Sequence, residues 1–143
     1  MKSLISIAAG IIVGTIVLSL VEGIGNMVLA STLGIEAISA QGAAALETAR
    51  PTASLLVVVL AYLVGPFAGG LIAGSLAPNN RHYHAAAVGL FQLMLGVIAI
   101  SLFPHPVWFW VVTFATFIPA ALAGASVAAW RAKRGRGKSR ARA

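Results

Sequence analysis

Residues 4–30 read LISIAAGIIVGTIVLSLVEGIGNMVLA, and this stretch decides the fold. A membrane-spanning helix needs about 20 apolar residues to cross roughly 30 Å of hydrocarbon. The stretch is longer than that, and its one formally charged residue is Glu22. It therefore predicts a membrane span that tilts or projects beyond the bilayer.

The rest of the chain has the same character. Its 143 residues are 59% hydrophobic and 9% charged, against about 25% charged residues in soluble domains. Further apolar runs over 54–77, 83–103 and 107–130 each suit one crossing, and the short connection at 104–106 makes the last two an antiparallel hairpin. We therefore predict an all-α, polytopic membrane protein: one domain, residues 1–130, folded as a bundle of four transmembrane helices in the lipid bilayer.

The basic residues predict the orientation. Lys2 and Arg81 fall on one side of the four-span arrangement, together with seven basic residues at 131–143, whereas Arg50 falls on the other. Basic loops stay in the cytoplasm, so both termini are expected there. The run after Lys2 exceeds the usual apolar core of a secretory signal and lacks a good cleavage site, so we read it as a span that is retained.

Two segments lie outside the spans. The outer loop 35–52 mixes alanines with a few charged and amide side chains, which predicts a short interfacial helix. The tail 131–143 is interpreted as a disordered, cytoplasmic determinant of topology. Its alternatives are binding to anionic lipid, which attracts basic residues near the membrane surface, and contact with nucleic acid, which we consider unlikely.

Small residues recur at helical spacing in every span, and such residues let transmembrane helices pack closely. The favoured interpretation is packing within the bundle, and the alternative is a dimerisation face. Span 54–77 has glycines on more than one face, so it should be central. The glycines predicted to pack are Gly10, Gly14, Gly65, Gly69, Gly70, Gly74, Gly89, Gly96 and Gly124.

Polar residues in the spans define a candidate proton or polar site. In the first span Thr15, Ser19, Glu22 and Asn26 share one helical face, which should look inward. The candidate residues are Glu22, Asn26, Ser19, His105, Gln92, Tyr62, Thr113 and Thr116.

Glu22 leads this set because ionisable residues inside a membrane are costly and usually functional. It could exchange a proton as a substrate binds, or it could serve as a structural hydrogen-bonding group. Twenty residues at 1.5 Å each place it about 30 Å from Lys2, near the outer end of its span. His105 or Arg50 could reach it there.

Several chemistries are disfavoured. The chain has no cysteine, so disulfides and thiol nucleophiles are excluded. His82 and His84 stand at i, i+2 with no carboxylate nearby, a poor metal site because such side chains diverge on a helix. Neither a metal nor a cofactor is expected. Glu22 and His105 are the only visible candidates for catalysis, so we do not expect an enzyme.

The stretches LVEGIGN at 20–26 and PHPVWFW at 104–110 resemble small bacterial four-span membrane proteins. The resemblance implies a bacterial inner membrane and no particular activity. The expected role is non-enzymatic, acting through helix packing as a homo-oligomer or as an accessory subunit of a larger membrane complex. The alternative is a small proton-coupled transporter or channel subunit that uses Glu22.

Overall fold

The computed structural model describes residues 1–33, 52–102 and 105–140. All its regular structure is helical in these ranges, which confirms the all-α fold class. Each helix contains a segment long and apolar enough to cross a membrane. The helices are α1 (Lys2–Leu33), α3 (Thr52–Leu76), α4 (Arg81–Ser101) and α5 (Val107–Arg140).

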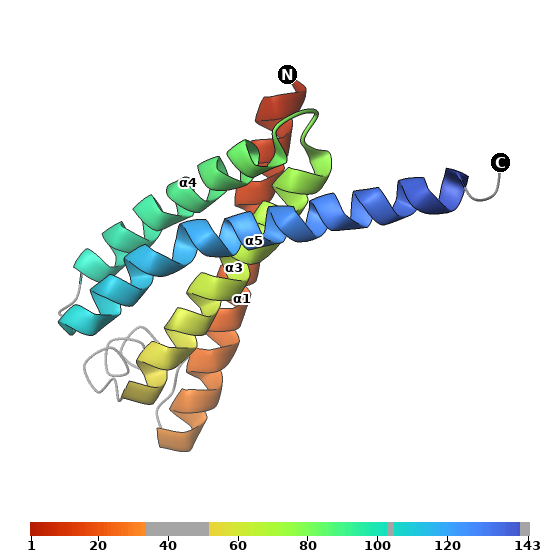
Figure 1. Ribbon diagram of the computed structural model, residues 1–143. Coiled ribbons are helices and arrows are strands. Elements are labelled where there is room, and N and C mark those ends of the chain that lie inside the picture. The colour runs from red at the N-terminus through yellow and green to blue at the C-terminus, as the bar shows by residue number, and fades with distance from the viewer. Residues whose placement is uncertain (34–51, 103–104, 141–143) are drawn as a thin grey trace.

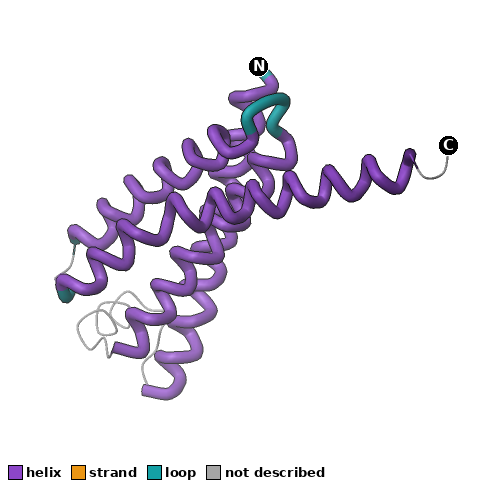
Figure 2. Tube along the Cα trace, viewed as in Figure 1, coloured by secondary structure: helices purple, strands orange, loops and turns teal. Residues whose placement is uncertain are grey.

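The helices form two antiparallel pairs (Figures 1 and 2). Helix α1 lies along α3, and α4 lies along α5 as the expected hairpin. Helix α3 packs against all three other helices, most extensively against α1 and α5. The prediction that the second span is central is thus confirmed, and residues on α3 can meet residues from any other helix.

The turn between α3 and α4 is tied to α5. Asn80 has a left-handed backbone with φ 42°, a conformation that asparagine tolerates better than most residues. Just after this turn Arg81 donates from Nη1 to the carbonyl oxygen of Ala128 at 3.1 Å, and His82 Nε2 hydrogen-bonds Ser126 Oγ at 3.2 Å. These contacts fix α5 beside the start of α4.

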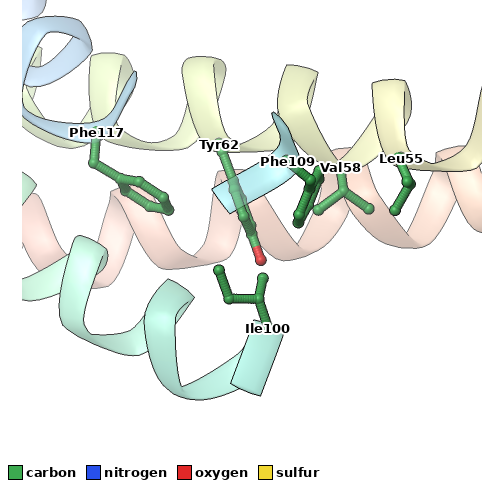
Figure 3. Close-up of a cluster of buried hydrophobic side chains, with 6 residues drawn as sticks. All are labelled: Leu55, Val58, Tyr62, Ile100, Phe109 and Phe117. Atoms are coloured by element: carbon green, nitrogen blue, oxygen red, sulfur yellow. The ribbon is translucent and has the colours of Figure 1, made fainter. Parts of the chain in front are cut away.

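An aromatic core joins α3 and α5. The ring of Tyr62 lies between the rings of Phe109 and Phe117, with centroid separations of 6.2 and 4.8 Å, and it extends from α3 towards Ile100 of α4 (Figure 3). All four side chains are buried. Leu55 and Val58 complete the cluster on α3. Tyr62 is therefore held in a fixed position.

Helices α1 and α3 approach so closely that only glycine fits at two reciprocal contacts. A Cβ on Gly10 would lie 2.7 Å from the carbonyl oxygen of Gly69, and a Cβ on Gly69 would lie 2.7 Å from that of Gly10. Gly14 and Gly65 are related in the same way at 2.9 Å. Both distances are below ordinary van der Waals contact, so these glycines set the spacing of the helices.

The other predicted packing glycines also contact neighbouring helices of the same chain. Gly70 and Gly124 lie directly against the backbone of the facing helix, at Ala121 of α5 and at Phe67 of α3. The remaining contacts are Gly74 with Ala125, Gly89 with Phe117, Ile118 and Ala121, and Gly96 with Phe117. The small-residue faces are used inside the bundle.

Two predictions for the connecting segments had different outcomes. Helix α5 continues past residue 130, where the tail was expected to begin, to Arg140, and it projects beyond the other helices (Figure 1). The guanidinium of Arg134 lies 3.8 Å from the Trp130 ring centroid, one turn away, in a cation–π contact that supports this helix. The interfacial helix expected at 35–52 falls outside the described residues, apart from Thr52 at the start of α3.

Candidate intramembrane polar site

A partly open cavity of about 130 Å³ is lined by residues of α1, α3 and α4, and it shares Tyr62 with the aromatic core. It brings together three of the residues singled out from the sequence, Glu22, Tyr62 and Gln92, one from each helix. Its lining residues are Thr15, Leu18, Glu22, Tyr62, Gln92, Leu95, Gly96 and Ala99. One carboxyl group thus shares a small space with an amide, a phenol and a hydroxyl.

Gln92 is the polar group buried most completely in this cavity. Its side chain is 2% exposed, and neither Oε1 nor Nε2 has a hydrogen-bond partner among the described residues. The amide lies against α1, where a Cβ on Gly14 would come within 2.5 Å of Nε2. A buried amide without partners costs about 1–3 kcal/mol for each unsatisfied group, so the contents of the cavity should include hydrogen-bonding groups.

Thr15 and Tyr62 add two hydroxyl groups to the lining. Thr15 lies on α1 two turns before Glu22, and its Oγ1 is buried without a partner among the described residues. Tyr62 is 4% exposed and is clamped by the two phenylalanine rings described above. The polar lining therefore comes from a rigid aromatic position on α3 and from the inward face of α1.

The depth of the site differs from the simplest expectation. Glu22 is half-buried, and α1 continues for eleven residues beyond it to Leu33. Gln92 is at the middle of α4, which runs from Arg81 to Ser101. Because Glu22 and Gln92 line one cavity, this space reaches the middle of the bundle rather than only one end of it.

The inward-facing stripe predicted on α1 was wrong for Ser19, which is exposed. At about 100° per residue, Ser19 is the member of the stripe that lies farthest round the helix from the packing glycines Gly10 and Gly14. Asn26 is half-buried, and its Oδ1 has no hydrogen-bond partner among the described residues. The stripe is therefore split between the bundle and its outer surface.

The remaining candidates lie outside the cavity lining. His105 donates from Nδ1 to the carbonyl oxygen of Ile100 at 3.1 Å, and its ring stacks on Phe109 with centroids 4.9 Å apart. Thr113 is fully buried with its Oγ1 unpartnered among the described residues, whereas Thr116 Oγ1 donates to the carbonyl oxygen of Val112 in its own helix. Arg50, the other residue considered as a partner for Glu22, is outside the described residues.

The polar turn at the other end of the bundle contains a second buried group. His84 is 5% exposed, and its Nδ1 donates to the carbonyl oxygen of Asn80 at 3.2 Å. Its Nε2 is buried with no hydrogen-bond partner in the described ranges. In those same ranges no group of three or more potential ligands could hold a metal ion.

Sequence reasoning missed the apolar walls of the cavity. Leu18, Leu95 and Ala99 resemble every other apolar residue in their spans, and nothing in the pattern marks them. Thr15 was recognised on the polar stripe but was not included in the candidate site, although its spacing from Glu22 was the available signal.

Within the described residues, the fold and site define a helical protein with four membrane-capable helices and a partly open, mainly apolar pocket that contains a few polar groups. No protein-family model matches the chain, and no curated protein or solved structure is significantly similar to it.

Proposed function

We propose that this protein is a small proton-coupled transporter or channel subunit that uses Glu22 as its proton-exchanging group. The observation that carries the proposal is the shared cavity, which places Glu22 beside Gln92 and Tyr62 inside the bundle. A protein that acts only through helix packing has no need to place a carboxyl group and a buried amide without a hydrogen-bond partner, Glu22 and Gln92, in one cavity.

The chemistry of the lining supports occupancy by water or a polar solute. A cavity holds water when it is roomy and offers polar partners, whereas apolar cavities of similar size stay dry. Here Gln92 and Thr15 present buried polar atoms without protein partners in the described part of the chain. Protons reach Glu22 through such contents, and the proposal requires no covalent catalysis, cofactor or metal.

Proton titration of the full chain in detergent tests this role. Over the pH range in which the protein stays folded, the wild type should release one more proton per chain than Glu22→Gln, because glutamine has no ionisable side chain. The matched control is Ser75→Ala, because Ser75 is exposed and its Oγ donates only within α3, to Leu71. The control should titrate as the wild type does. Superimposable curves for the wild type and Glu22→Gln, with both folded by circular dichroism, would overturn the proposal.

We propose a location in a bacterial inner membrane with both termini in the cytoplasm. The excess of basic residues at Lys2, Arg81 and 131–140 supports this orientation. The contact of Arg81 with Ala128 adds a physical reason, since it brings the turn and the basic end of α5 together. Accessibility of single cysteines introduced at positions 2 and 138 to a membrane-impermeant reagent tests it.

The second candidate is assembly through the outer face of α1, as a homo-oligomer or within a larger complex. Helix α1 is the least buried span, at 17% of its apolar window against 39–44% in the other three. Gly23 has no other atom within 4 Å of a Cβ built on it, and exposed Ser19 lies one turn away. A Gly23→Leu variant should lower the mass of the protein–detergent complex if this face joins two copies, and an unchanged mass argues against it.

A further inference from the structure

We propose that the projecting end of α5 binds anionic phospholipids through the basic turn that follows Trp130, a role that goes beyond the proposed function and does not rest on it. Helix α5 runs from Val107 to Arg140, about 50 Å at 1.5 Å per residue. Crossing the hydrocarbon of a bilayer takes about 30 Å. The last turns of α5 therefore extend past the hydrocarbon, in the part that projects beyond the other helices (Figure 1).

This projecting end carries a dense positive charge. Its basic residues are Arg131, Lys133, Arg134, Arg136, Lys138 and Arg140. No aspartate or glutamate follows Glu47 in the sequence, so neither α3 nor α4, which pack against α5, carries a carboxylate. The neighbouring helices thus do not neutralise this charge, and a surface that bears phosphate groups is complementary to it.

Trp130 places the first turn of this segment at the depth of the lipid headgroups. Its side chain is 51% exposed, and tryptophan is enriched at the boundary between hydrocarbon and headgroups. The Arg134 guanidinium lies 3.8 Å from the centroid of this ring, so the cation is held at the level of the tryptophan. Arg131 and Lys133 are exposed in the same turn. Three basic side chains therefore leave α5 where lipid phosphates lie.

Helix α4 brings a fourth cation to this level. Arg81 donates from Nη1 to the carbonyl oxygen of Ala128 at 3.1 Å, and Ala128 stands one turn before Arg131. A guanidinium has five N–H donors in a planar fork that matches two phosphate oxygens, and this bond uses one of them. Like charges gathered at one level repel each other, and an anion among them relieves this repulsion. The end of the bundle at Arg81 and Arg131 is thus suited to a phosphodiester.

The distribution of the basic positions favours headgroups that surround the helix. At about 100° per residue these positions form two stripes on opposite sides of α5. The stripes are Arg131, Arg134 and Lys138 on one side and Lys133, Arg136 and Arg140 on the other. A helix that lies flat on a membrane has one apolar face and one basic face, which this segment lacks. A helix that passes through the headgroup layer meets lipid on every side, whereas nucleic acid arriving from water meets residues 136–140 first.

Native mass spectrometry of the full chain in a neutral detergent tests the proposal. The probes are phosphatidylglycerol and phosphatidylcholine with the same acyl chains, and the dissociation constant of the first bound lipid is measured for each. The wild type should bind phosphatidylglycerol about fivefold or more tightly, the effect of one basic residue near a membrane surface. Raising ammonium acetate from about 0.1 to 1 M shortens the Debye length from about 10 to 3 Å and should reduce this preference.

Two triple variants with the same loss of charge locate the site. The inner variant is Arg131→Gln/Lys133→Gln/Arg134→Gln, and the outer variant is Arg136→Gln/Lys138→Gln/Arg140→Gln. The outer substitutions lie about 7 Å farther along the helix axis. The inner variant should reduce the preference for phosphatidylglycerol below about twofold, whereas the outer variant should keep most of it. Circular dichroism checks folding, and if a variant does not fold, the lipid comparison and salt dependence of the wild type decide the question.

Four results would overturn the proposal. Equal affinity of the wild type for both lipids removes the lipid assignment, and equal losses in the inner and outer variants remove the site beside Trp130. Competition by inorganic phosphate at constant ionic strength would assign the site to a free anion. A labelled single-stranded oligonucleotide that binds the wild type and loses affinity mainly in the outer variant, without any lipid preference, would assign the segment to nucleic acid. The Glu22 titration is a separate measurement, so the proposed function stands or fails independently.

Discussion

Replacing Gly70 by alanine should destabilise the bundle at the contact between α3 and α5. A Cβ at this position would lie 2.6 Å from the carbonyl carbon and 2.7 Å from the Cα of Ala121, whereas ordinary contact begins at 3.4 Å, so both atoms are 0.7–0.8 Å too close. The carbonyl oxygen of Ala121 is closer still. These are backbone atoms, so the helices themselves must separate.

The expected loss follows from two opposing effects. Overpacking of a tight interface costs about 1–3 kcal/mol, while glycine to alanine in a helix gains up to about 1 kcal/mol from backbone entropy. Gly23→Ala is the matched control, because its added methyl group meets nothing within 4 Å. Gly70→Ala should therefore fall below Gly23→Ala by about 1–3 kcal/mol in free energy of unfolding.

Unfolding by sodium dodecyl sulfate measures this difference, with circular dichroism and tryptophan fluorescence as signals. Trp110 packs against the aromatic core and reports on α5. A second substitution, Ala121→Gly, should not rescue Gly70→Ala, because the overlap involves the Ala121 backbone rather than its methyl group. Equal stability of Gly70→Ala and Gly23→Ala, or rescue by Ala121→Gly, would refute the assigned contact.

Three further predictions concern the site and the frame around it. Gly14→Ala should lower the free energy of unfolding by about 1–3 kcal/mol, because its Cβ would lie 2.5 Å from Gln92 Nε2 and 2.9 Å from the carbonyl oxygen of Gly65; unfolding in detergent checks this, and wild-type stability contradicts it. Phe117→Ala should lower the free energy of unfolding by about 3–5 kcal/mol, since this ring is fully buried against Tyr62; a loss below about 1 kcal/mol in detergent unfolding would count against that packing. Arg81→Gln should remove the guanidinium donor to the Ala128 carbonyl and speed amide hydrogen exchange in the turns of α5 around Ala128; exchange at the wild-type rate would show that this bond does not hold the helix.

Much of the fold could be predicted because long apolar runs in the sequence mark the membrane spans directly. The fourth span was expected to begin at residue 107, and α5 begins at Val107, immediately after a proline that cannot continue a helix as donor. The third span was expected from residue 83, where the apolar run begins, but α4 begins at Arg81. The left-handed backbone of Asn80 sets this start, so the first helical residues are polar.

The end of α5 could not be predicted from apolar content. Hydropathy marks where a chain leaves hydrocarbon, but arginine, lysine and alanine are good helix formers, so the helix continues through a charged segment to Arg140. Helix α5 therefore ends ten residues after the expected end of the span at residue 130.

The candidate site could be predicted in its members but not in its assembly. Glu22, Tyr62 and Gln92 each stand out as polar residues in apolar spans. Their meeting in one cavity depends on how far each helix is rotated and on close approach at glycines such as Gly14, which no single span encodes. Ser19 shows the same point. The four polar residues of α1 spread around part of the helix, so the residue at the edge of this face, Ser19, faces away from the bundle.

The reciprocal glycine contacts between α1 and α3 also have an evolutionary consequence. At Gly10 with Gly69, and at Gly14 with Gly65, each residue occupies the space that a side chain on the other would need. Neither member of a pair can acquire a larger side chain alone, and a change in the partner offers no relief, since the obstacle is backbone. These four positions should thus stay small in any descendant that keeps this helix spacing, whereas Gly23 should drift freely unless another chain covers it.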